Sequence, residues 1–243
     1  MSDLQGRNEG VFATTRWTLV ARARGESPEA RMALSDLCAA YYGPVEAFIR
    51  RQTTDLQETR DLTQEFFARL LAGSGVGGAD PERGRFRSYV LGAVKHFLHA
   101  ERVRRGAAKR GSGAEHVVLE GESGTEAGLQ VADSGAVAAD VAFDRAWAHA
   151  LLERALTRLG GEMVEEGKGR TFEVLKGCLQ GAVAVKPQAE LGEALGMSEA
   201  TVKVAIHRLR KRFREVVRAE IAETLVDGAN VDEEMRYLIQ ALT

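Results

Sequence analysis

Apolar positions recur every three or four residues along most of the N-terminal half, which predicts helices rather than strands. Residues 17–24 form a short amphipathic stretch, and a longer helix is expected after Ser27 and Pro28, because serine caps helices and proline suits their first turn. The pair Gly43-Pro44 is expected to bend or break this helix, since proline lacks the amide hydrogen that a helix interior requires. Nothing in this half alternates with the two-residue period of a strand.

Two more helices are predicted before residue 111. The stretch 56–72 has a regular apolar side and runs into a glycine-rich segment at 73–78, which ends it, and 80–86 is expected to form a turn. The stretch 86–105 also has one apolar side. The apolar residues are Leu62, Phe66, Phe67, Leu70 and Leu71 in the first helix and Tyr89, Val90, Val94, Phe97 and Leu98 in the second.

The C-terminal half begins with an amphipathic helix at 143–160, followed by a helix around 170–179. Two helices then meet at a short turn. Gly192 is small where the two helices cross closely, Gly196 can take a positive φ, and Ser198 is a good N-cap. The second helix has an inward stripe of Val202, Ile206, Leu209, Phe213 and Val217, and its other side presents Lys203, His207, Arg210, Lys211, Arg214 and Arg218.

This pair of helices has the spacing of a helix-turn-helix, whose second helix reads the major groove of DNA with its N-terminal part. Lysine and arginine farther along such a helix neutralise phosphates. The alternative is an ordinary helical hairpin with a solvated basic face. The tail 219–243 is also amphipathic, with Met235, Leu238, Ile239 and Leu242, and is expected either to pack on the second domain or to bind a partner.

Charge is distributed unevenly along the chain, although the formal net charge is only −2. Residues 102–110 are basic, whereas 112–142 contain six acidic residues, no lysine or arginine, and much glycine, alanine and serine. Such a stretch buries too little surface to offset its ordering entropy, so a flexible linker is predicted. The predicted fold class is all-α, with two small helical domains. The bounds are 1–111 for the first domain, 112–142 for the linker, 143–218 for the second domain and 219–243 for an amphipathic extension.

Several classes of protein are disfavoured. The two cysteines are far apart and lack ligand spacing, so a disulfide framework and a cysteine-built zinc site are not expected. His96 and His99 share a predicted helix, but no third ligand is near in sequence, and no metal or cofactor is expected. No phosphate-binding loop, metalloprotease motif or paired carboxylate indicates an enzyme or a small-molecule substrate. No apolar run reaches membrane-spanning length and the first ten residues do not resemble a signal peptide, so a cytoplasmic protein is expected.

The stretch GEALGMSEATVKVAIHRLRKRFRE, at 192–215, resembles region four of bacterial sigma factors, especially the extracytoplasmic-function (ECF) group of the sigma-70 family. The stretch DLTQEFFARLLA, at 61–72, resembles the region-two helix that these factors dock on RNA polymerase. The stretch 86–105 resembles the part that melts and reads the downstream (minus ten) promoter element. These motifs lie in the family's order and span most of the chain. The resemblance implies a sigma factor that binds RNA polymerase core and promoter DNA, with an anti-sigma factor or other regulatory protein as a further candidate partner.

The resemblance also implies three functional surfaces. The polar side of helix 61–72 would meet the polymerase, although an ordinary solvated face is the alternative. Helix 86–105 would bind the downstream element; the family usually has Trp at Tyr89 and Asn at His96, and Tyr89 can equally belong to the core. The implied polymerase-binding residues are Asp61, Gln64, Glu65 and Arg69, and those for the downstream element are Ser88, Tyr89, Lys95, His96, His99, Arg102 and Arg105.

The third surface is the basic helix, which would read the upstream (minus thirty-five) element. Lys203 and Arg208 suit guanine, Val204 suits a thymine methyl group, and the later cations suit phosphates. A helix-turn-helix regulator that binds DNA without docking on polymerase is the alternative function, but it has no need for the region-two motif. The implied upstream-element residues are Ser198, Glu199, Thr201, Lys203, Val204, His207, Arg208, Arg210, Lys211 and Arg214.

Overall fold

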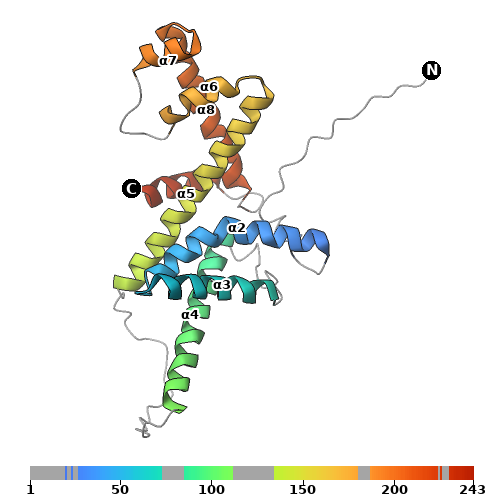
Figure 1. Cartoon of the computed structure of the whole chain (residues 1–243), viewed down its shortest axis with the longest axis vertical. Helices are drawn as coiled ribbons and strands as arrows, with labels where there is room; N and C mark the ends of the chain where they lie inside the picture. The colour runs from blue at the N-terminus through green and yellow to red at the C-terminus, as the bar shows by residue number, and fades with distance from the viewer. Residues whose placement is uncertain are drawn as a thin grey trace, which may run out of the picture. The chain divides into compact units, whose positions relative to one another are not determined.

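The computed structural model describes residues 20, 23, 27–72, 85–111, 134–179, 187–223, 225 and 230–243 of the 243-residue chain. Within these ranges every regular element is a helix and no strand occurs, so the predicted all-α class is confirmed (Figure 1). The described residues divide into two compact units, one from Val20 to Trp147 and one from Ala148 to Thr243. The predicted helix at 17–24 falls almost wholly outside the described residues. None of the helices described combines the length and the apolar character that crossing a membrane requires.

The first unit begins with α2 (Pro28–Arg50), which starts where the sequence predicts. The Ser27 hydroxyl accepts a hydrogen bond from the Ala30 amide at 3.1 Å, and Pro28 occupies the first turn. Of the bend or break expected at Gly43-Pro44, the break does not occur: α2 continues without interruption to Arg50. Tyr41, Pro44, Val45, Phe48 and Ile49 are all buried, and this packing offsets the roughly 3 kcal/mol that proline costs inside a helix.

α2 packs against α3 (Leu56–Ala72) and α4 (Phe86–Gly111), and Figure 1 shows α4 crossing the other two helices. The predicted apolar stripes form most of the core between them. The exceptions are Leu71, which is 50% exposed, and Leu70 and Tyr89, which are half-buried. Ring contacts lock α3 to α4, with the Phe66 and Phe97 centroids 5.6 Å apart. The buried stripe residues are Leu62, Phe66, Phe67, Val90, Val94, Phe97 and Leu98.

The helix α5 (Ser134–Glu165) begins inside the predicted linker. Residues 112–133 of that linker fall outside the described residues, but 134–142 are helical, so the predicted boundary at 142 is wrong. The small residues that suggested a flexible chain include several alanines, and alanine is the strongest helix former. Ala139, Phe143 and Trp147 recur every four residues and are at most 1% exposed. Burial of this regular apolar side stabilises the helix from residue 134 onward.

The second unit contains the rest of α5, then α6 (Gly169–Leu175), the 3₁₀ turn η2 (Lys176–Cys178), α7 (Gln188–Leu195), α8 (Glu199–Ala222) and α9 (Val231–Leu242). α7 packs against α6 and α8, and α9 packs against α8. The inward stripe of α8 is buried as predicted, apart from the half-buried Phe213. In α9, Leu238 is buried and Asp232 pairs with Arg218 of α8, so the tail packs on the second unit.

Candidate nucleic-acid interface

The turn between α7 and α8 has the geometry that the sequence predicts. Gly196 has a φ of 64° and ends α7 in the left-handed conformation. Ser198 caps α8, because its hydroxyl accepts a hydrogen bond from the Thr201 amide at 3.3 Å. At Gly192, a Cβ atom would lie only 2.6 Å from the carbonyl oxygen of Met197. The turn therefore packs as closely as it does on α7 because this position has no side chain.

The outward face of α8 carries nearly all of the candidate upstream-element residues. Each of the ten is exposed, and Val204 is 49% exposed. Within the described residues, Lys203, Arg208, Lys211 and Arg214 form no ion pair. Four cations on one helix thus remain available to an external anion.

Arg210 and Arg212, unlike these four cations, form hydrogen bonds to other residues that the structure describes. Arg210 donates two hydrogen bonds, of 3.3 and 3.2 Å, to the backbone oxygen of Cys178, so it ties α8 to η2. Arg212 pairs with Glu162 at 2.9 Å and with Glu166 at 2.6 Å. Hydrogen bonds from Lys168 and from Arg212 lower the pKa of the Glu166 carboxyl. Arg210 was expected to contact phosphate, and its guanidinium instead has an internal partner.

A hollow of about 350 Å³ lies beside the first turns of α8. Thr201, Val204 and Arg208 line one side of it, and Met163 and Leu175 are among the residues that line the rest. Three candidate DNA-reading residues therefore border a largely apolar surface. Such a surface suits a methyl group, and thymine presents one in the major groove.

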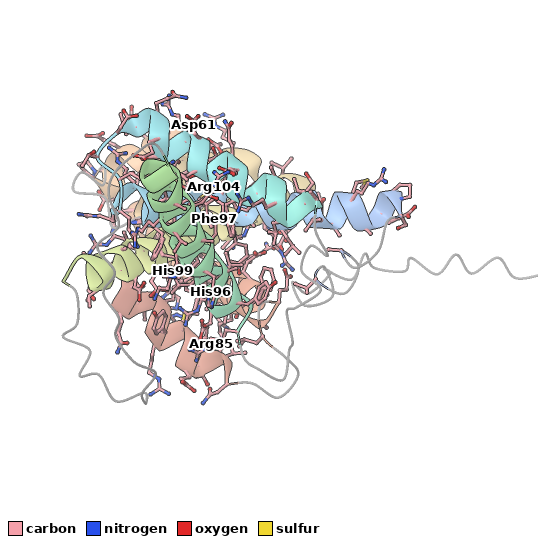
Figure 2. All side chains as sticks on the ribbon, turned by 90° about the horizontal axis from the view of Figure 1, so that it is seen from below. Asp61, Arg85, His96, Phe97, His99 and Arg104 are labelled. Atoms are coloured by element: carbon pink, nitrogen blue, oxygen red, sulfur yellow. The ribbon has the colours of Figure 1, made fainter. Side chains whose placement is uncertain are left out.

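The basic face of α4 is present as predicted, but its lysine and arginines have internal partners. Lys95, His99, Arg102 and Arg105 are all exposed, and Figure 2 shows His96 and His99 along the same helix. Lys95 pairs with Asp140 of α5, and their side-chain nitrogen and oxygen are 2.7 Å apart. Arg102 donates to the Gln52 side chain, and Arg105 pairs with Glu58. An anion that binds this face must replace these contacts.

The start of α4 contains one residue that the sequence did not single out. Arg87 is only 7% exposed, and its guanidinium lies 3.0 Å from an Asp144 carboxylate oxygen and 4.8 Å from the Trp147 ring centroid. Its neighbour Ser88 is exposed, whereas Tyr89 is half-buried with its ring stacked on Phe86, the centroids 5.8 Å apart. Tyr89 thus combines a core contact with partial exposure. No periodicity could have identified Arg87, because its partners are more than fifty residues away.

The polar side of α3 is partly occupied by a network of ion pairs. Arg69 lies 2.6 Å from Glu65, 2.6 Å from Glu101 and 5.1 Å from the Phe97 ring centroid. Glu101 is 3% exposed, and Arg104 pairs with it as well. Burial alone would raise the pKa of Glu101, but hydrogen bonds from Arg104 and Arg69 outweigh burial and hold this pKa below its usual range. Glu65 and Arg69 therefore link α3 to α4.

Two candidate polymerase-binding residues remain outside this network. Asp61 and Gln64 are exposed on α3, and Figure 2 shows Asp61 on this helix. Asp61 accepts a hydrogen bond of 2.9 Å from Gln57, one turn earlier. In the part of the chain that the structure describes, no group of three or more histidine, cysteine, aspartate or glutamate side chains could hold a metal ion.

Comparison of the chain with family models, with curated proteins and with solved structures finds no match in any of the three.

Proposed function

We propose that this protein is an RNA polymerase sigma factor of the sigma-70 family, in the ECF group. It would bind the polymerase core, select promoters and help to open the duplex, without a cofactor, a small-molecule substrate or chemistry of its own. The observation that carries this proposal is the outward face of α8. Four cations there form no ion pair within the described residues, directly after a glycine turn and a serine cap. Nucleic acid is the polyanion that a helix-turn-helix with such a face binds.

The position of each cation along α8 suggests its role. Lys203 and Arg208 lie within the first three turns, from which a recognition helix reaches base edges, and both can donate to guanine O6 and N7. Val204 lies between them and can contact a thymine methyl group. Lys211 and Arg214 lie farther along and suit phosphates. Arg210 contributes less directly, because it holds the carbonyl of Cys178.

The first unit would supply polymerase docking and downstream recognition. Asp61 and Gln64 offer an exposed polar patch on α3 for the polymerase. On α4, the partly exposed Tyr89 and the exposed His96 and His99 offer rings on which unstacked bases can lie. A sigma factor works where its polymerase is, which implies a cytoplasmic protein.

A helix-turn-helix regulator that does not bind polymerase is the second candidate. One observation favours it: Glu65 and Arg69 are engaged by Glu101 and Arg104, so the polar patch on α3 is smaller than the sequence suggested. Both candidates predict DNA binding through α8. Only the sigma factor predicts a stable complex with core polymerase.

The deciding experiment is a pull-down with purified core polymerase, followed by promoter-dependent transcription with the reconstituted enzyme. The wild-type chain should bind core and start transcription at specific promoters. Asp61→Arg should weaken core binding, whereas Asp36→Arg should not, because Asp36 is an exposed aspartate on α2 outside the patch. DNA binding without core binding would identify a regulator, and absence of both would overturn the proposal.

A further inference from the structure

The first turns of α5 lie against the basic face of α4 and present carboxylates to it. Asp140 lies 2.7 Å from Lys95, and Asp144 lies 3.0 Å from Arg87. The two aspartates are four residues apart, so they share one side of the helix. Both cations belong to the helix that the proposed function assigns to nucleic acid. Lys95 is exposed and is a candidate nucleic-acid residue, so the Asp140 carboxylate occupies a position where a phosphate would bind.

The two ion pairs differ in how firmly they are held. The Arg87 and Asp144 side chains are 7% and 19% exposed, and Trp147 packs under the guanidinium at 4.8 Å. The Lys95 and Asp140 side chains are 45% and 37% exposed, so water and salt screen this pair. The Asp144 end of the segment is thus an anchor. The Asp140 end can be displaced at little cost.

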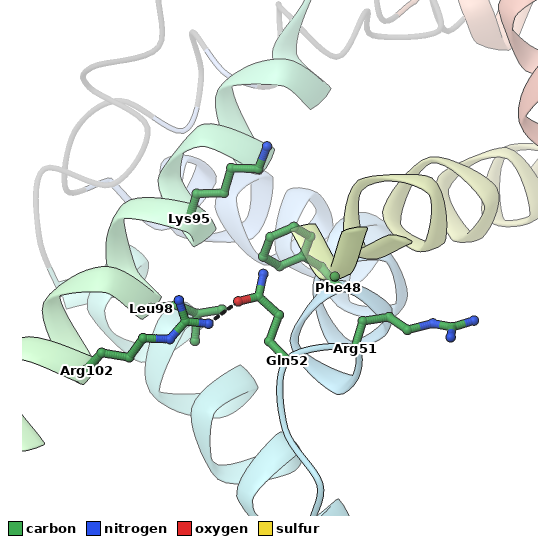
Figure 3. A pocket seen from close by; sticks show the side chains of 7 residues that line it. Phe48, Arg51, Gln52, Lys95, Leu98 and Arg102 are labelled. Atoms are coloured by element: carbon green, nitrogen blue, oxygen red, sulfur yellow. Dashed lines mark hydrogen bonds between the residues drawn. The ribbon is translucent and has the colours of Figure 1, made fainter. Parts of the chain in front are cut away.

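A cavity of about 370 Å³ lies next to the exchangeable pair. Its wall contains three cations, Arg51, Lys95 and Arg102, and Gly135 at the start of α5 lines it as well. Figure 3 shows Arg102 and Gln52 pointing toward each other across the cavity, with the first turn of α5 beside Phe48. Three cations around one hollow attract anions, and one of the three, Lys95, pairs with Asp140 at 2.7 Å.

We propose that residues 134–147 are an internal competitor for nucleic acid, in which Asp140 occupies the phosphate position on Lys95 until a strand displaces it. The proposal rests on the proposed role of α4 in binding a single strand. Displacement exchanges a carboxylate for a phosphate on Lys95 and opens the cavity at Gly135, while the pair of Arg87 with Asp144 keeps the segment attached. The apparent association constant for a strand is then the intrinsic association constant multiplied by the fraction of molecules in which Asp140 is released.

The first test compares two matched variants of the full chain. Asp140→Asn removes the competing charge, and Asp36→Asn removes an equal charge from an exposed aspartate that has no ion pair in the described residues. Binding of a short fluorescent single-stranded oligonucleotide of mixed sequence would be measured by anisotropy at low salt. Asp140→Asn should tighten binding roughly two- to fivefold, the size expected for an exposed ion pair. Asp36→Asn should change it much less. Equal effects of the two variants would overturn the proposal.

Amide hydrogen exchange gives a second test, which does not depend on measuring a binding constant. Adding the oligonucleotide to the wild-type chain should reduce amide protection in 138–143, and Asp140→Asn should reduce it without the oligonucleotide. Protection in 144–147 should change less, because Asp144 and Trp147 hold this end. Unchanged protection at 138–143 in both cases would contradict displacement.

The outcome for this proposal can be separated from the outcome for the sigma-factor function. Selective tightening by Asp140→Asn supports the competitor even if core polymerase does not bind. Specific transcription together with equal effects of Asp140→Asn and Asp36→Asn would leave the sigma factor intact and remove the competitor. If no variant binds the oligonucleotide, both the competitor and the proposed role of α4 are wrong.

Discussion

Replacing Gly192 with alanine should destabilise the unit that contains α7 and α8. The new methyl group would lie 2.6 Å from the Met197 carbonyl oxygen and 3.6 Å from a Val202 methyl group. The first distance is far below van der Waals contact, and the atom that is hit belongs to the backbone. The Met197 amide also donates a hydrogen bond of 2.9 Å to the Gly192 oxygen, so the turn cannot move away without straining it.

The expected size follows from two opposing effects. Forcing a methyl group into a packed site costs about 1–3 kcal/mol. Exchanging glycine for alanine inside a helix returns up to about 1 kcal/mol. The difference is a net loss of about 0–2 kcal/mol, and we expect about 1–2 kcal/mol because the backbone cannot rotate away. Gly161 provides the control: it is exposed on α5, and a methyl group added there would meet no atom within 4 Å beyond the backbone of its own helix.

Gly161→Ala should stabilise the same unit by about 0.5–1 kcal/mol, so the two substitutions should have opposite signs. Scanning calorimetry of the full chain would measure the effect on the unfolding of the unit Ala148–Thr243, at about 4–8 °C in Tm for each kcal/mol. DNA binding of Gly192→Ala should fall as well, because the turn positions α8. A rise in Tm for Gly192→Ala equal to that for Gly161→Ala would refute the close approach of α7 to the turn.

Three further predictions concern the same surfaces. In selection from randomised upstream elements, Arg208→Ala should change the preferred sequence at a cost of about 1–3 kcal/mol, whereas Lys211→Ala should weaken all sequences alike and flatten the salt dependence; an unchanged preference for Arg208→Ala would exclude it as a reader. Ser198→Ala should cost about 1 kcal/mol in thermal unfolding and Ser198→Asp almost nothing, because aspartate also caps helices; equal losses would argue against the cap. Glu101→Gln should cost about 1.5–3 kcal/mol at neutral pH. Burial raises the pKa of Glu101 but its arginine partners lower it by more, so the folded pKa lies below its usual range. The stability that the Glu101 carboxylate contributes is therefore complete above that range and is lost as pH falls through the folded pKa. If the difference in unfolding free energy between wild type and Glu101→Gln, measured by urea titration, did not shrink in acid, this prediction would be contradicted.

Helices with a regular apolar period could be predicted well from the sequence. Leu62, Phe66 and Phe67 indicated α3, and Val202 and Ile206 indicated α8, because burial on one side imposes this period. The error at the linker boundary arose because local composition and tertiary packing disagree there: residues 134–142 fold because Phe143 and Trp147 extend a buried side that begins among alanines. Pro44 stays inside an unbroken α2 because its neighbours are buried.

The sequence predicts which helix faces are exposed and basic, but it does not predict which side chains pair with the cations on those faces. Helical period alone places Lys203 and Arg208 on the exposed side of α8. It cannot show that Arg210 reaches the Cys178 carbonyl or that Lys95 meets Asp140, because these contacts span 32 and 45 residues. Contacts between helices depend on how the helices pack, and the spacing within one helix contains no such information.

The difference between the two basic helices suggests an order of events under the proposed function. Four outward cations of α8 (Lys203, Arg208, Lys211 and Arg214) have no ion pair in the described residues, so binding a duplex through them releases counterions and needs no rearrangement of this helix. On α4, Lys95 already pairs with Asp140 and Arg105 with Glu58, so a phosphate that binds either cation must first displace a carboxylate, and the net electrostatic gain is smaller. The basic face of α4 should therefore bind a closed duplex weakly. It can bind a single strand when contacts to the bases add to the affinity. Upstream recognition by α8 should therefore precede engagement of α4, and the salt dependence of initial binding should come mainly from α8.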